Sequence, residues 1–243
     1  MRFAWTVICL AGCGSSSPAA PDAAVTPDAP PVDMPAADAP AGFGTLGGMC
    51  GVLGETQLTE TTPELFRDSF TFARAFVDPD DRPLLTEGGR RLLEVPNAGG
   101  SSSLSEAFAF EELARCETAG LLKTETEIVY NTAGKITDLE VAMLGHKIGV
   151  SVTRAFAFPL GTPYTVDQAT VLITRKLNDI QASTANVSDA DRWDKQVLAV
   201  MAIDSQAADV VAGVWAGLDA SVRADTLVVV SVTEGEDSWI YTQ

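Results

Sequence analysis

A continuous apolar run and a Val-rich segment near the C-terminus constrain the fold of this chain more than any other feature. Residues 197–203 and 226–233 are rich in Val and contain no charged side chain, which is typical of strands buried on both faces. Between them, Ser205 is predicted to cap a helix, and upstream Thr165 and Gln168 form a capping box that begins another. Apolar strands that alternate with helices form parallel crossovers, so we predict an α/β domain with helices on both faces of the sheet.

Ahead of these elements we expect a further helix and three short strands. Ser103 and Glu106 have the spacing of a capping box, and the helix that they begin is expected to run to about Leu122. The three strands are expected at residues 127–130, 138–144 and 147–154. Gly145 and His146 are expected to be the two loop residues of a hairpin between the last two strands.

The expected hairpin has two unlike faces. With that two-residue loop, Asp138 lies opposite Thr153 and Glu140 lies opposite Ser151. One face is wholly apolar and should pack on a helix; its members are Leu139, Val141, Met143, Ile148, Val150 and Val152. The other face gathers the polar residues, which are therefore the candidate catalytic group: Asp138, Glu140, Lys147, Ser151 and Thr153.

The element order helix, three strands, helix, strand over roughly residues 101–233 resembles the restriction-endonuclease-like superfamily, also called PD-(D/E)XK. In that superfamily an Asp begins the second strand and an acid-x-Lys triplet lies in the third, where they hold Mg²⁺ and activate water. Asp138 matches the first acid, but Ser-Val-Thr at residues 151–153 stands where the triplet would be. The resemblance thus implies Mg²⁺ ligation by Asp138, with Glu106 or Glu111 as the glutamate of the preceding helix.

Three interpretations of this degenerate motif stay open. In the preferred one, the polar face is solvated or covered, and the nuclease-like core has lost standard catalysis and serves in binding or structure. In the second, Glu140 and Lys147 replace the missing ligand and cation, which gives a divergent Mg²⁺-dependent phosphodiesterase or nuclease. In the third, the chain is an unrelated α/β lipoprotein that binds a small solute or a protein.

The N-terminal residues predict export and attachment to a membrane. A positive residue and a short apolar run have the features of a secretory signal, and the run is too short to span a bilayer. Leu-Ala-Gly-Cys at residues 10–13 resembles the lipobox of bacterial lipoproteins, which implies removal of residues 1–12 and lipidation of Cys13. Gly14 then implies the outer membrane of the cell envelope by the enterobacterial sorting rule. Residues 13–42, rich in Pro, Ala and Asp, are expected to form a disordered tether.

The remaining residues, 43–243, have the size of a single domain. We expect residues 43–100 to form an N-terminal wrap over a core that comprises residues 101–243. The weakly patterned wrap is expected to contain an edge strand at residues 65–72 and a short helix at 86–95.

Cysteine content and charge limit the partners of this domain. Cys50 and Cys116 are expected to form a disulfide in an oxidising envelope, with two buried free thiols as the alternative. His146 is the single histidine, so a zinc site with four nitrogen or sulfur ligands is excluded. The formal net charge of -17 disfavours binding of nucleic acid or anionic lipid, because phosphate recognition usually begins with a basic surface.

Overall fold

A seven-stranded mixed sheet organises the chain in the computed structural model, which describes residues 42–96 and 102–242. Its strand order is β1-β2-β7-β6-β5-β4-β3. The strands are β1 (Thr45–Gly48), β2 (Leu65–Phe72), β3 (Gly120–Thr124), β4 (Leu139–Met143), β5 (His146–Ala155), β6 (Lys195–Ala202) and β7 (Leu227–Gly235). The four central strands β2, β7, β6 and β5 are parallel, and β1, β4 and β3 join them in antiparallel pairs. The predicted signal, Cys13 and tether lie outside the described residues.

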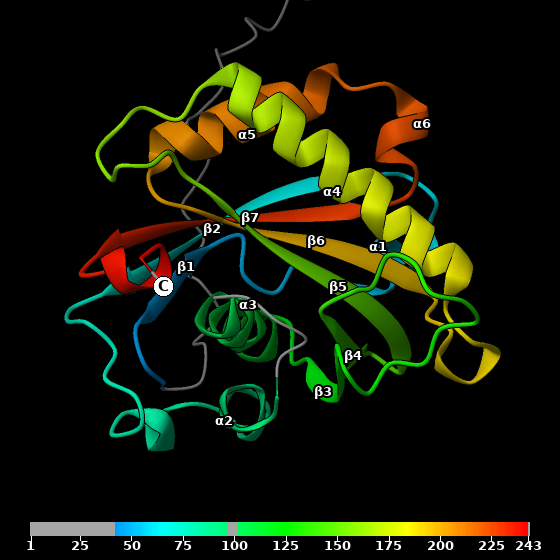
Figure 1. Ribbon diagram of the computed structural model, residues 1–243, viewed down its shortest axis with the longest axis horizontal. Helices are drawn as coiled ribbons and strands as arrows, with labels where there is room; N and C mark the ends of the chain where they lie inside the picture. The colour runs from blue at the N-terminus through cyan, green and yellow to red at the C-terminus, as the bar shows by residue number, and fades with distance from the viewer. Residues whose placement is uncertain (1–41, 97–101, 243) are drawn as a thin grey trace, which may run out of the picture. The chain divides into compact units, whose positions relative to one another are not determined.

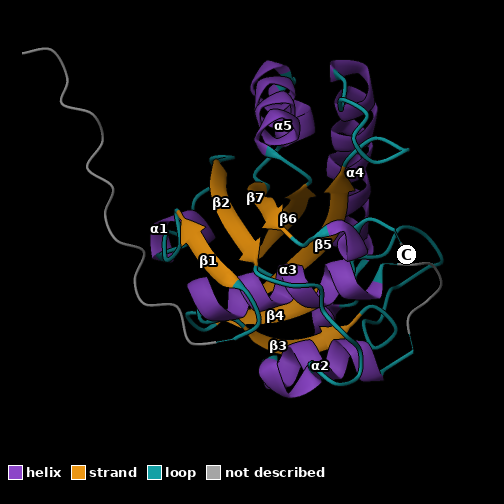
Figure 2. Cartoon of the chain, turned by 90° about the vertical axis from the view of Figure 1, so that its left-hand side faces the viewer, coloured by secondary structure: helices purple, strands orange, loops and turns teal. Residues whose placement is uncertain are grey.

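Helices cover both faces of the sheet, as predicted (Figure 1). The helices are α1 (Glu55–Thr59), α2 (Glu87–Glu94), α3 (Ser103–Cys116), α4 (Val166–Asn186), α5 (Ser205–Gly217) and α6 (Ala220–Arg223). Short 3-10 turns lie at Arg82–Leu84, Asp189–Asp191 and Ser238–Ile240. Helices α4 and α5 pack on one face, and α3 packs on the other with α2 beside it (Figure 2). No helix in the described part of the chain is long and apolar enough to span a bilayer.

Strand β6 shows why the two apolar runs end up at the centre of the sheet. All eight of its residues are buried. Val197 and Ala199 lie in the core beneath α3, whereas Leu198 and Val200 lie in the core beneath α4 and α5. Because successive side chains of a strand point to opposite faces, only an unbroken apolar run can fill both cores.

Helix α3 differs from its prediction at both ends. Ser102 is the N-cap, and the helix ends at Cys116 instead of continuing to about Leu122. The helix stops because Thr118 adopts a left-handed backbone with φ of 56°, which lets the Ala119 N–H donate to Leu113 C=O at 3.1 Å. The chain then enters β3, so the strand expected at 127–130 is found earlier. The N-cap of α5 likewise lies one residue before the predicted Ser205, at Asp204.

The hairpin of β4 and β5 forms in a register displaced by two residues from the predicted one. Its loop residues are Leu144 and Gly145, both with positive φ, so Glu140 pairs with Gly149 and not with Ser151. A displacement of two residues keeps every side chain on its predicted face. The six apolar residues of the hairpin are accordingly all buried against α3, as expected.

The N-terminal segment is part of the sheet and not a wrap over it. Strand β2 has the predicted bounds, but it lies between β1 and β7 and is not an edge strand. Its alternate residues Phe66, Phe70 and Phe72 are buried on one face, and its inner position comes from parallel pairing with β7 on one side and antiparallel pairing with β1 on the other. The predicted disulfide is confirmed: Cys50 and Cys116 join the segment after β1 to the end of α3.

Candidate functional site

Asp138 binds the neighbouring strand instead of facing an open surface. Its Oδ2 accepts hydrogen bonds from Ser151 Oγ at 3.0 Å and from the Val152 backbone N–H at 2.6 Å. Asp138 therefore lies beside Ser151 and not beside Thr153, as the displaced register requires. Both acceptor contacts tie the start of β4 to the middle of β5, and Ser151 and Thr153 are themselves buried.

The second pair of predicted residues forms an ion pair between an exposed lysine and a buried glutamate. Lys147 Nζ lies 3.2 Å from Glu140 Oε1 and also donates to the Ala190 carbonyl at 2.9 Å. Glu140 is only 1% exposed. The Trp193 indole packs on Gly149, where a Cβ atom would lie 2.6 Å from the ring. The polar face of the hairpin is thus partly paired and is contacted by the segment before β6, while Glu140 Oε2 stays buried without a hydrogen-bond partner among the described residues.

The two candidate glutamates of α3 lie on the opposite side of the sheet. The apolar face of the hairpin packs on α3, so the polar face that carries Glu140 points away from this helix. Glu111 Oε1 instead accepts from the Thr86 backbone N–H at 2.7 Å and from Thr86 Oγ1 at 2.5 Å, while burial raises the pKa of Glu111. Glu106 is also buried on α3. Neither glutamate joins Asp138, and within 42–96 and 102–242 no three His, Cys, Asp or Glu side chains are placed to hold a metal ion.

A buried carboxyl pair that the sequence analysis missed lies between β2 and α3. Asp68 and Glu112 are 4% and 2% exposed, and Ser231 Oγ of β7 donates to Glu112 Oε2. Burial raises the pKa of Asp68 to about 6, and burial with the negative charge of Asp68 raises the pKa of Glu112 well above its usual value. The signal was present, because Asp68 falls on the same side of β2 as the buried Phe66 and Phe70.

A cavity of about 460 Å³ lies beside the end of β5 and the first half of α4. Parallel strands commonly place binding sites beyond their carboxyl ends, which is where this cavity lies. Its lining residues are Arg154, Phe156, Tyr164, Asp167, Gln168, Val171, Leu172 and Arg175. The predicted capping box of Thr165 and Gln168 is confirmed, and it fixes the first turn of α4 at the cavity wall.

Two arginines give this cavity a positive lining. Arg154 Nη1 donates to the Ile240 carbonyl at 2.9 Å, and its guanidinium lies 5.8 Å from the centre of the Phe156 ring. Burial lowers the pKa of Arg154, an effect that Tyr241 and Glu106 oppose. Arg175 on α4 is exposed. Among the described residues, no carboxylate forms an ion pair with either arginine.

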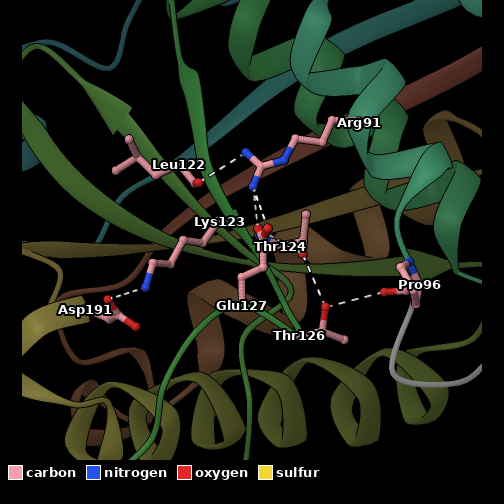
Figure 3. Close-up of polar contacts among 8 residues, drawn as sticks. All are labelled: Arg91, Pro96, Leu122, Lys123, Thr124, Thr126, Glu127 and Asp191. Carbon is pink, nitrogen blue, oxygen red and sulfur yellow. Dashed lines mark hydrogen bonds and ion pairs between the residues drawn. The ribbon is translucent and has the colours of Figure 1, made fainter.

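Two other cavities have a different electrostatic character. The one between α2, α3 and β3 is lined by Arg91, but Glu127 accepts from Arg91 Nη2 at 2.7 and 2.6 Å, as Figure 3 shows. The one at the ends of β6 and β7 is lined by the acidic residues Asp204, Glu234 and Asp237. Of these three cavities, the one beside α4 alone presents cations that are not paired with a described carboxylate.

The fold and this cavity define an α/β domain with a crevice at the carboxyl end of its parallel strands. No family model matches the chain, and no solved structure matches it. The AAC-rich mRNA clone AAC4 protein of Dictyostelium discoideum is similar to it, with 41% identity over 154 residues. The similarity covers 61% of this chain and 22% of that relative, so the chain spans about a fifth of the relative's length. The name of the relative states no activity.

Proposed function

We propose that the chain is a lipid-anchored protein of the cell envelope whose α/β domain serves in binding and not in phosphodiester cleavage. The observation that carries the proposal is the internal pairing of the predicted catalytic face. Asp138 bonds to Ser151 and Val152, and Glu140 pairs with Lys147 beneath the Trp193 indole. These contacts engage Asp138 and one carboxylate oxygen of Glu140, so most of the oxygen ligands with which this face could hold Mg²⁺ and a phosphate are already used.

The element order supports a nuclease-like ancestry for this domain. Helix α3 precedes the antiparallel strands β3, β4 and β5, and α4 and the parallel strand β6 follow. This is the order of the restriction-endonuclease-like core that the sequence resembles. The missing acid-x-Lys triplet at residues 151–153 is consistent with a core that has lost standard catalysis.

The anchor is proposed from the lipobox resemblance of residues 10–13 and from the composition of the segment after it. Metabolic labelling with an alkyne-bearing fatty acid tests it in a bacterial host. We expect label on the chain and none on Cys13→Ser, with the outer-membrane fraction retaining the first and not the second. Equal labelling of both, or none of either, contradicts the anchor.

Cleavage assays test the absence of phosphodiesterase activity. We expect the purified full chain to leave single-stranded DNA, double-stranded DNA and RNA intact with Mg²⁺ or Mn²⁺. Cleavage that disappears in Asp138→Ala would establish the divergent nuclease instead. Asp80→Ala, altered at an exposed loop residue, is the matched control and should behave as the unaltered chain. Cleavage that is equal in Asp138→Ala and Asp80→Ala would refute both the proposed absence of activity and the divergent nuclease that uses Asp138.

A further inference from the structure

We infer that the cavity beside α4 binds a small organic monocarboxylate with an apolar or aromatic body. This inference gives the ligand class of the binding role proposed above and rests on that role. It depends on three features of the cavity: its unpaired arginines, its single acidic residue and its apolar wall. No other cavity described above combines them.

The arginines supply the recognition of a carboxylate. Arg154 uses one of its five N–H donors on the Ile240 carbonyl and is held in place by the Phe156 ring, while Arg175 approaches from α4. A guanidinium binds a carboxylate through two parallel hydrogen bonds, and such charged bonds are stronger than neutral ones. In a chain of net charge -17, cations left without a carboxylate partner at a cavity indicate an anionic ligand.

The net charge of the cavity lining favours a ligand with a single negative charge. Asp167, in the first turn of α4, lines the same cavity as the two arginines. Its carboxylate offsets one of the two positive charges, so the lining carries a net charge of about one. A monoanion neutralises this lining, whereas a phosphate monoester would bring a second negative charge towards Asp167.

The remaining wall selects an apolar body. Phe156, Leu172 and Val171 provide an apolar surface, and Val171 is 69% exposed despite its position in the lining. The Tyr164 hydroxyl is buried on the same wall with no hydrogen-bond partner among the described residues. A volume of about 460 Å³ lies within the range of small-molecule sites, about 300–1,000 Å³.

Calorimetric titration with three naphthalene compounds tests the inference. The protein is the full chain with Cys13→Ser, which cannot be acylated at that residue. The compounds share one ring system and differ in their head group: naphthoate, naphthylmethanol and naphthyl phosphate. We expect saturable binding of one naphthoate at about pH 8, with naphthylmethanol and naphthyl phosphate at least about 10-fold weaker.

Variants locate the binding. Arg175→Ala removes an exposed side chain and is expected to weaken naphthoate binding about 10-fold to 100-fold. Arg192→Ala is the matched control, since it removes the same charge from an exposed arginine whose ion pair is with Asp189. Val171→Asp should also weaken binding, because it places a second carboxylate in the apolar wall.

Several results overturn the inference. They are an absence of saturable naphthoate binding, equal binding of naphthylmethanol, tighter binding of naphthyl phosphate, or equal effects of Arg175→Ala and Arg192→Ala. Should naphthoate fail to bind while the full chain also leaves nucleic acids intact, only the ligand class fails. Cleavage that depends on Asp138 refutes the proposed function itself.

Discussion

The buried carboxyl pair of Asp68 and Glu112 predicts that the folded state becomes less stable as the pH rises. Burial is the largest cause of the raised pKa of Asp68, and the negative charge of Glu117 adds to it. The Glu112 side chain and the Met49 backbone N–H act in the opposite direction. Burial and the negative charge of Asp68 raise the pKa of Glu112 well above its usual value as well.

The sign of the effect follows from proton binding in the two states. Between the ordinary pKa of 3.8 and the raised value of about 6, folded Asp68 binds more protons than unfolded Asp68 does. The free energy of unfolding therefore falls as the pH rises through this interval, and it stays lower above it. The raised pKa corresponds to a loss of about 3 kcal/mol, because each pKa unit is worth about 1.4 kcal/mol. A salt-bridged aspartate with a lowered pKa would produce the opposite trend.

Asp68→Asn isolates this contribution, since an amide has nearly the same shape and does not titrate. The diagnostic quantity is therefore the change in unfolding free energy caused by Asp68→Asn at about pH 8 minus the change at about pH 4. We expect this difference to be about 3 kcal/mol in favour of the variant.

Urea unfolding followed by Trp fluorescence, with the disulfide kept oxidised, measures the difference. Asp80→Asn, an exposed aspartate in the loop after β2, is the matched control and should show no such difference. A difference below about 1 kcal/mol for Asp68→Asn, or one equal to the control, would refute the proposed burial of an ionised carboxyl. Glu112→Gln gives a second check: it keeps an acceptor for Ser231 and removes the titration of Glu112, so the fall in stability that begins at the ordinary pKa of 4.5 and continues to the raised value should become smaller.

Three further substitutions test the packing around these elements. Replacing Cys50 and Cys116 by Ser opens a loop of 66 residues and should cost about 4 kcal/mol in urea unfolding; a cost below about 1 kcal/mol contradicts the bridge. Gly149→Ala places a Cβ atom 2.6 Å from the Trp193 indole, so we expect a loss of about 1–3 kcal/mol and a lower Tm, whereas an unchanged Tm means that the indole lies elsewhere. Glu117→Gln weakens an acceptor of three consecutive backbone N–H groups in the loop after β1; hydrogen exchange of those groups should speed up, and unchanged protection contradicts the contacts.

The elements that could be predicted are those whose burial follows from the spacing of apolar residues within one segment of the sequence. The run at 197–203 had to be central because its alternate residues fill two different cores. The register of the hairpin, in contrast, does not follow from the spacing of its apolar residues. Both the predicted and the observed register place apolar residues opposite each other, as Leu139 with Val150 and Val141 with Ile148 show. Alternation cannot separate registers that differ by two residues, so the turn at residues 144–145 decides between them.

The position of β2 shows a second limit. Its bounds followed from local alternation, but its place inside the sheet follows from parallel pairing with β7, more than 150 residues later in the chain. No local pattern reports such a pairing, because a parallel neighbour can come from any distant segment. Asp68 shares its face of β2 with Phe66 and Phe70, and this placement among apolar residues was the one sequence feature that indicated a covered aspartate.

The same limit applies to the candidate sites. Alternation correctly indicates which polar residues of a hairpin share a face, but it does not show whether that face stays open. Here the cover comes from Trp193, more than 40 residues after Gly149, and it turns a plausible ligand set into a closed structural contact. Conversely, Arg154 at a strand end and Arg175 on the exposed side of a helix each look ordinary in the sequence. Only the packing of α4 along β5 brings these two arginines to one cavity. The residues on which the proposed binding site depends therefore could not be recognised from the sequence around each of them.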